Sequence, residues 1–80
     1  MNLFNLKKGQ CCLIDKILIY GDTRRRLLDL GLISGTKVKC VEISPFGDPK
    51  AFLIRGAVIA LRKKECEQIL IEEPFYEQEK

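Results

Sequence analysis

Three consecutive arginines, Arg24 to Arg26, directly precede a leucine-rich stretch that ends in "GLISG". Such a run could contact nucleic acid phosphates, belong to a phosphate loop, or form the face of a small adaptor protein. Exposed cations in the first turn of a helix oppose the helix macrodipole by about 0.3–1 kcal/mol each. Helix stability alone therefore does not select Arg24 and Arg25, which are either tolerated surface charges or contacts to a partner.

Nucleotide and catalytic chemistry are disfavoured by what surrounds the arginines. Gly31 and Gly35 stand one residue too close for a phosphate loop, and Thr36 precedes Lys37 instead of following it. The chain has no histidine, the usual acid–base group of an active site. No sequence neighbour identifies an activated cysteine nucleophile. We expect no catalytic residues and no enzymatic activity.

The four cysteines contain no CxxC pair, so the sequence indicates no zinc or redox site and no cofactor. Cys11 and Cys12 fall in a predicted strand, where neighbouring side chains point to opposite faces. We expect Cys12 to face inward and Cys11 outward. Cys11 is the one thiol that could serve as a surface metal ligand, although an ordinary exposed cysteine is the favoured interpretation.

The elements that must position these residues follow from hydrophobic alternation and turn residues. A strand over residues 9–17 is followed by a helix over residues 23–30, with Asp22 as its N-cap and Gly31 as its end. A second strand over residues 36–43 changes phase near Cys40 and Val41, which predicts a bulge. Two strands flank Gly56, a helical turn covers residues 63–66, and a last strand covers residues 68–71. The sum is a mainly all-β, five-stranded, partly open small barrel with one short helix after the first strand.

The predicted core consists of the apolar residues that alternate inward along these elements. Its members are Cys12, Ile14, Ile17, Leu27, Leu30, Val38, Cys40, Phe52, Ile54, Ile59, Leu61 and Ile69.

Eighty residues allow one compact domain. No apolar run approaches the ~20 residues of a membrane span, and no signal peptide pattern is present, so we expect a cytoplasmic protein. Residues 72–80 contain four Glu and one Lys, which leaves a formal charge of +6 on residues 1–71. This acidic tail is either solvated, the favoured interpretation, or folded back on the basic surface.

Two surfaces are candidates for a partner. The helix presents Arg24, Arg25 and Leu28 beside the loop residues Leu32 and Ile33, and the turn "SPFGDP" presents Phe46. An exposed aromatic side chain at a turn tip is typical of an interface anchor. The alternative is that Phe46 folds over the open end of the barrel as part of the core.

The stretches "RRRLLDLGLISG", "VKCVEISPFGDPKAFLIRG" and "VIALRKKECEQILIE" together resemble the FeoA family of bacterial ferrous iron uptake. The resemblance covers residues 6–71 and implies an SH3-like barrel. We expect this domain to span residues 1–73 and to be followed by an acidic, flexible tail over residues 74–80. The resemblance also implies a role beside FeoB, the membrane iron transporter with a cytoplasmic GTPase part, and a place at the inner face of the membrane through that partner.

We therefore expect a non-enzymatic adaptor that binds FeoB and modulates it. The expected partner-binding residues are Arg24, Arg25, Leu28, Leu32, Ile33, Phe46 and Asp48. The alternatives are a small basic barrel that binds RNA, which steep salt dependence would reveal, and a metal-responsive regulatory domain. Nucleic acid is not the expected partner, the chain is not expected to be membrane-embedded, and a homo-oligomer is left open.

Overall fold

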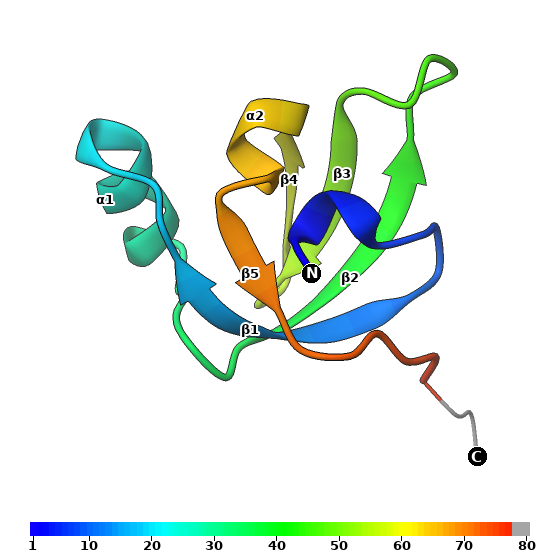
Figure 1. Ribbon diagram of the computed structural model, residues 1–80, viewed down its shortest axis with the longest axis horizontal. Coiled ribbons are helices and arrows are strands. Elements are labelled where there is room, and N and C mark those ends of the chain that lie inside the picture. Colours follow the sequence, from blue (N-terminus) through cyan, green and yellow to red (C-terminus); the bar gives the residue numbers. More distant parts are fainter. Residues whose placement is uncertain (78–80) are drawn as a thin grey trace.

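The computed structural model describes residues 1–77 of the chain. Its elements in order are η1 (Leu3–Asn5), β1 (Cys11–Ile17), α1 (Gly21–Asp29), β2 (Lys37–Ile43), β3 (Lys50–Ile54), β4 (Ala57–Leu61), α2 (Lys63–Cys66) and β5 (Ile69–Ile71). The five strands form one antiparallel sheet in the order β4-β3-β2-β1-β5, which curls into an open barrel (Figure 1). The predicted fold class is confirmed.

Two irregularities and one tight turn shape the barrel. The β2–β3 register shifts between Cys40 and Glu42, which confirms the predicted bulge, and the β1–β5 register shifts between Ile14 and Lys16. Bulges increase the local bend and twist of a strand. The β3–β4 hairpin turns through Arg55 and Gly56, whose φ angles of 48° and 86° match a two-residue type I′ turn.

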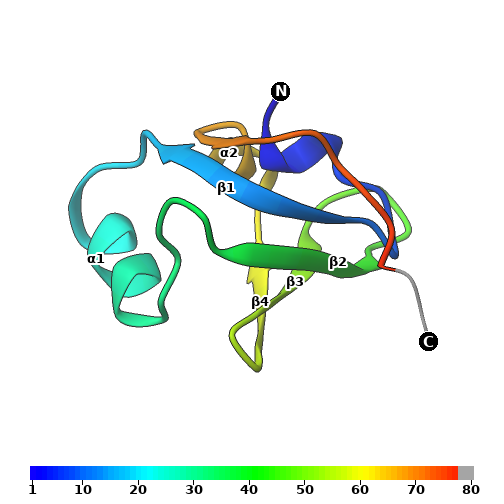
Figure 2. The same cartoon turned by 90° about the horizontal axis from the view of Figure 1, so that it is seen from below.

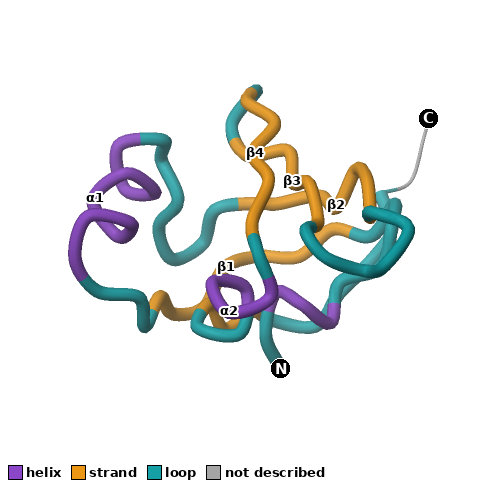
Figure 3. The backbone as a smooth tube through the Cα atoms, turned by 90° about the horizontal axis from the view of Figure 1, so that it is seen from above, coloured by secondary structure: helices purple, strands orange, loops and turns teal. Residues whose placement is uncertain are grey.

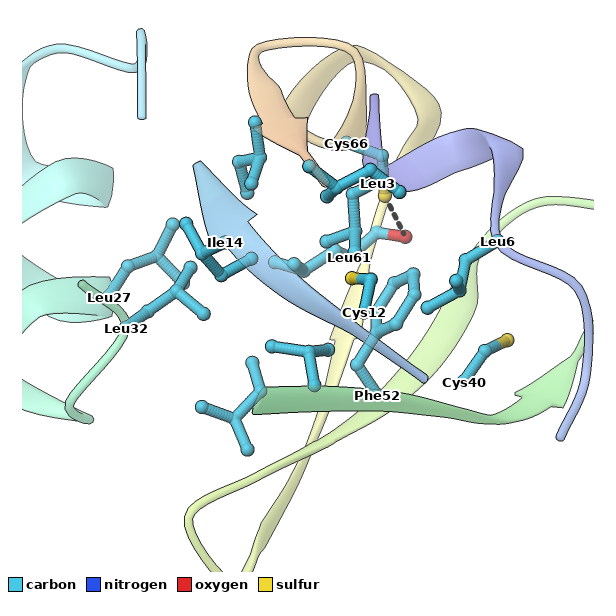
Figure 4. Packing of buried hydrophobic residues seen from close by; sticks show 14 of the residues in the cluster. Leu3, Leu6, Cys12, Ile14, Leu27, Leu32, Cys40, Phe52, Leu61 and Cys66 are labelled. Carbon is cyan, nitrogen blue, oxygen red and sulfur yellow. Dashed lines mark hydrogen bonds between the residues drawn. The ribbon is translucent and has the colours of Figure 1, made fainter. Parts of the chain in front are cut away.

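The core lies between the curled strands, α1 and the N-terminal segment (Figure 4). Cys12, Ile14, Leu27, Val38, Cys40, Phe52, Ile54, Leu61 and Ile69 are buried as predicted. Ile17, Leu30 and Ile59 are only half-buried, which corrects their assignment to the centre of the core. Residues that the sequence did not assign to the core complete it: Leu3, Leu6, Ile19, Leu32, Cys66 and Ile71.

The N-terminal segment is held to the barrel by a buried lysine. The Nζ atom of Lys50 donates hydrogen bonds to the carbonyl oxygens of Phe4 at 2.5 Å and Leu6 at 3.0 Å, and it lies 4.4 Å from the centroid of the Phe4 ring. Charged donors to carbonyl oxygens make strong hydrogen bonds and satisfy a buried ammonium group. Lys50 thereby fixes Leu3 and Leu6 over the core, while Phe46, at 97% exposure, takes no part in covering it.

The helix α1 begins earlier than predicted. It starts at Gly21, with Tyr20 at the N-cap and no side-chain cap, so Asp22 lies inside the first turn and is not the N-cap. Its carboxylate still complements the positive end of the helix. The C-terminal end follows the prediction: Gly31, with φ of 92°, donates to Leu28 O at 2.9 Å, and Leu32 N donates to Leu27 O at 2.9 Å. This pair of bonds is a Schellman motif.

Among residues 1–77, no helix is both long enough and apolar enough to span a membrane.

A groove between the first strand and the helix

A surface groove of about 400 Å³ lies between the end of β1, the helix α1 and the loop that follows it. Its lining residues are Lys16, Ile17, Arg24, Leu28, Ile33 and Ser34. Figure 2 shows α1 at one end of the molecule, connected to β1 on one side and to β2 on the other. Arg24, Leu28 and Ile33, three residues predicted to bind a partner, therefore share one concave surface.

The helix is positioned by two leucines that point inward. Leu27 and Leu32 are fully buried and lie on the side of Ile14 that faces α1 (Figure 4). Leu28 is the next residue on the helix, and successive residues are about 100° apart, so its side chain turns outward and remains 41% exposed. The burial of Leu32 corrects the expectation that its side chain lies on the partner-facing surface.

The three arginines have different surroundings. The Nη1 atom of Arg24 donates to Ile17 O at 2.9 Å and to Ile19 O at 3.4 Å, which ties α1 to the end of β1. Arg26 lies 3.9 Å from the Glu65 carboxylate on α2. Arg25 is exposed, and it forms no ion pair within residues 1–77. Arg24 is thus a lining residue of the groove with a structural hydrogen-bonding role, whereas Arg25 is exposed and is not one of the lining residues.

The loop after α1 is held by a set of local hydrogen bonds. The Ser34 hydroxyl donates to Asp15 O at 2.6 Å, and Gly35 N donates to Ile14 O at 2.7 Å. The Thr36 hydroxyl donates to Gly31 O at 3.0 Å and accepts from Ile33 N at 3.1 Å. These bonds present Ile33 to solvent with 50% of its surface exposed.

The second candidate surface lies away from the groove. Phe46 occupies the tip of the β2–β3 turn, which projects on the opposite side of the molecule from α1 (Figure 1). The Asp48 carboxylate accepts a hydrogen bond from Lys63 N at 3.0 Å, which joins this turn to the start of α2. The structure therefore brings neither Phe46 nor Asp48 to the groove. The sequence did not identify Lys16, Ile17 and Ser34 as lining residues, because only the helix–strand packing places them there.

The acidic tail covers Cys11. Phe75 and Cys11 exchange two backbone hydrogen bonds, at 2.7 and 2.8 Å, and Glu77 pairs with Lys37 on β2. Cys11 is fully buried, which corrects its expected exposure and removes it as a surface ligand. Of the two alternatives for the tail, residues through Glu77 fold back on the basic surface. The boundary at residue 73 and the flexibility of residues 74–80 stay predictions, and residues 78–80 lie outside the described part.

Neighbouring charges and burial shift the pKa values of several side chains. The hydrogen bond and charge of Lys37 lower the pKa of Glu77, and those of Lys8 lower the pKa of Glu42. Burial raises the pKa of Cys12 and of Cys66 to about 12. Over residues 1–77, no three Cys, Asp or Glu side chains are grouped so that they could hold a metal ion.

Comparison with known proteins identifies the family. Residues 1–73 match the family model FeoA, described as the FeoA domain. The Fe(2+) transport protein A/Fe(2+) transporter FeoB fusion protein of Porphyromonas gingivalis is 28% identical over 72 residues, which are 90% of this chain and 8% of that protein. This chain thus corresponds to a small part of that curated relative.

Solved structures give the same result. The FeoA protein of Chlorobium tepidum superimposes with a TM-score of 0.83 at 35% identity, over 89% of this chain and 68% of that one. The FeoA of Stenotrophomonas maltophilia, described as a prokaryotic SH3 domain protein, has the same fold, with a TM-score of 0.76 at 24% identity over 90% of this chain and 89% of that one. The chain belongs to the FeoA family, whose members are associated with ferrous iron transport.

Proposed function

We propose that this chain is a non-enzymatic accessory protein of bacterial ferrous iron uptake that binds the cytoplasmic part of FeoB and modulates transport. The fusion protein of Porphyromonas gingivalis supports this partner, because it joins an FeoA-like segment and FeoB in one polypeptide. Joining two segments in one chain gives each a high effective concentration for the other, which favours their association. Such a fusion is therefore expected of proteins that bind each other. In this proposal the chain acts at the cytoplasmic face of the membrane through FeoB.

The observation that carries the proposal is the groove. Leu28 and Ile33 expose apolar side chains in its lining, and hydrogen bonds tie Arg24 of α1 and Ser34 of the loop to backbone carbonyl oxygens of β1. A preformed apolar depression with a charged rim has the anatomy of a protein interface. An inserted apolar side chain of the partner would be anchored there without the cost of ordering the groove first.

The rim charges indicate what the partner presents. Lys16 and Arg24 place cations in the lining of the groove, and Arg24 already donates hydrogen bonds to carbonyl oxygens. Cations at an interface rim steer an acidic surface toward the correct orientation and raise the association rate more than the affinity. We infer that the contacting surface of FeoB is apolar at its centre and acidic at its edge.

The test measures the affinity of the purified cytoplasmic part of FeoB for single-residue variants by calorimetric titration. Leu28→Glu buries a carboxylate in the proposed contact and is expected to weaken binding by about a hundredfold or more. Leu53→Glu is the matched control, because Leu53 on β3 has a similar exposure, 37% against 41%, and lies outside the groove. An unchanged affinity for Leu28→Glu would discard the groove, and a loss only for Phe46→Ser would move the interface to the β2–β3 turn.

A further inference from the structure

We propose that the free edge of β4 binds an extended peptide segment that carries carboxylates at both of its ends. The sheet has two edges, and only one of them is covered within the described residues. At the β5 edge, Asn2 forms a bridge with Leu70, and Ile71 N donates to Met1 O at 3.1 Å. The strand β4 pairs with β3 alone. Figure 3 shows the β3–β4 hairpin projecting away from the other strands.

The register of the hairpin decides which backbone groups are free. Ile54 and Ala57 flank the two-residue turn, so they form a hydrogen-bonded pair. Along an antiparallel pair of strands, residue pairs with mutual hydrogen bonds alternate with pairs that lack them. Leu53↔Val58 and Ala51↔Ala60 are therefore the pairs without mutual hydrogen bonds. The N–H and C=O groups of Val58 and Ala60 consequently point away from β3, toward the open edge.

The side chains along this edge suit a second strand. The sequence of β4, "AVIAL", has no charge, no proline and no bulge, the devices that usually protect an edge strand from pairing. Leu53 and Val58 form a cross-strand pair on the outer face, where Val58 is 64% exposed. A strand added here would gain backbone hydrogen bonds and cover Val58, which is how extended peptides bind to sheet edges.

Charge selects the occupant. Exposed cations lie at both ends of β4. Arg55, whose side chain passes along Gly31, lies in the turn before it. Arg62, Lys63 and Lys64 follow it directly, and the Lys63 ammonium group lies 5.7 Å from the centroid of the Phe4 ring. Antiparallel pairing of two copies of this chain would place Arg55 of one copy near Arg62 and Lys63 of the other, so self-pairing is opposed by repulsion. The same cations attract a segment with acidic ends. We therefore assign the edge to a heterologous strand with an apolar centre and carboxylate ends, and not to a second copy.

The test uses a fluorescently labelled synthetic peptide of alternating valine and threonine with two glutamates at each end, added to the full chain and followed by anisotropy. A second peptide replaces the glutamates by lysines, and a third has proline at its centre. We expect the glutamate peptide to bind about tenfold or more tightly than the lysine peptide, and the proline peptide not to bind. Amide hydrogen exchange on the saturated complex should slow at Val58 and Ala60.

Two charge reversals locate the contact. Lys64→Glu should weaken the glutamate peptide about fivefold and strengthen the lysine peptide. Lys16→Glu makes the same change at the groove and should alter neither affinity. Equal binding of both peptides, no binding at millimolar concentration, or protection at Leu28 and Ile33 instead of the β4 amides would each overturn the proposal. The exchange measurement needs no variant, so a misfolded variant cannot mask the result.

Discussion

Burial of individual thiols makes the stability of the folded protein depend on pH. Cys12 and Cys66 are fully buried, and the Cys66 Sγ lies 3.8 Å from Leu61 O, to which it donates (Figure 4). Burial disfavours the thiolate and raises the pKa of each group from 9.0 to about 12. A thiol that ionises at lower pH in the unfolded chain than in the folded one draws the equilibrium toward unfolding in alkali.

We expect the free energy of unfolding to fall between pH 9 and pH 12 by about 1.4 kcal/mol per pH unit for each of these two thiols, Cys12 and Cys66. The stabilisation is fully present below pH 9, because both states are then protonated. Urea unfolding at a series of pH values measures the slope. Cys66→Ala removes one titrating group, so its stability should decline less steeply than that of the native chain. Parallel slopes for the two proteins would contradict this account.

At the scale of elements, the connection that ends α1 combines a backbone requirement with a close contact. Gly31 has φ of 92°, and a Cβ atom built on it would lie 2.2 Å from Cδ of Arg55. Gly35, in the same loop, has φ of 87° and open space around its Cα. A residue with a side chain would be strained by the positive φ angle at either position. At Gly31 it would also clash with Arg55 in the β3–β4 turn.

Gly35→Ala is expected to cost about 1 kcal/mol of stability from backbone strain alone. Gly31→Ala should cost more, by the energy needed to move the Arg55 side chain. Adding Arg55→Ala to Gly31→Ala should remove the additional loss of stability. Adding Arg55→Ala to Gly35→Ala should bring no such gain. Thermal unfolding of these four variants, of Arg55→Ala alone and of the native chain forms the complete comparison. Equal costs for the two glycine variants would show that the Arg55 contact has no energetic weight.

At the scale of the whole molecule, the two ends of the chain complete the surface of the barrel. The N-terminal segment is fixed by Lys50, and the C-terminal segment pairs through Phe75 with β1. The tail also brings Glu77 to Lys37, so an acidic segment covers part of a basic surface. Removing the tail therefore changes both the burial of Cys11 and the charge of this face.

A chain that ends at Glu73 tests the predicted domain boundary. We expect it to fold, because residues 1–73 contain the whole core, and to lose about 1–3 kcal/mol with the Phe75 contacts. Cys11 should become reactive toward a thiol reagent in the folded state, where the full chain reacts slowly. Cys11→Ser in the shortened chain should abolish that reactivity. A shortened chain that fails to fold would move the domain boundary into the tail.

Much of the fold could be predicted from the sequence because its signals are local. Apolar alternation marks the strands, and the phase change at Cys40 marks the bulge, since both depend on a few neighbouring residues. Gly31 and Gly56 mark their turns because positive φ angles favour glycine wherever they occur. In the candidate site, Arg24, Leu28 and Ile33 could be named because they follow from the face of a short helix and its loop.

What only the tertiary structure decided involves residues far apart in the chain. Leu32 is buried because α1 packs on β1, and Cys11 is buried because Phe75 returns to cover it. Lys50 is buried because carbonyl oxygens more than 40 residues earlier in the chain accept the hydrogen bonds of its ammonium group. The exposure of a side chain depends on which distant segments of the chain pack against it. The periodicity of neighbouring residues does not predict these long-range contacts. The sequence therefore determined the strands, the turns and the family, and the packing of the two chain ends and the helix determined which surfaces remain open to a partner.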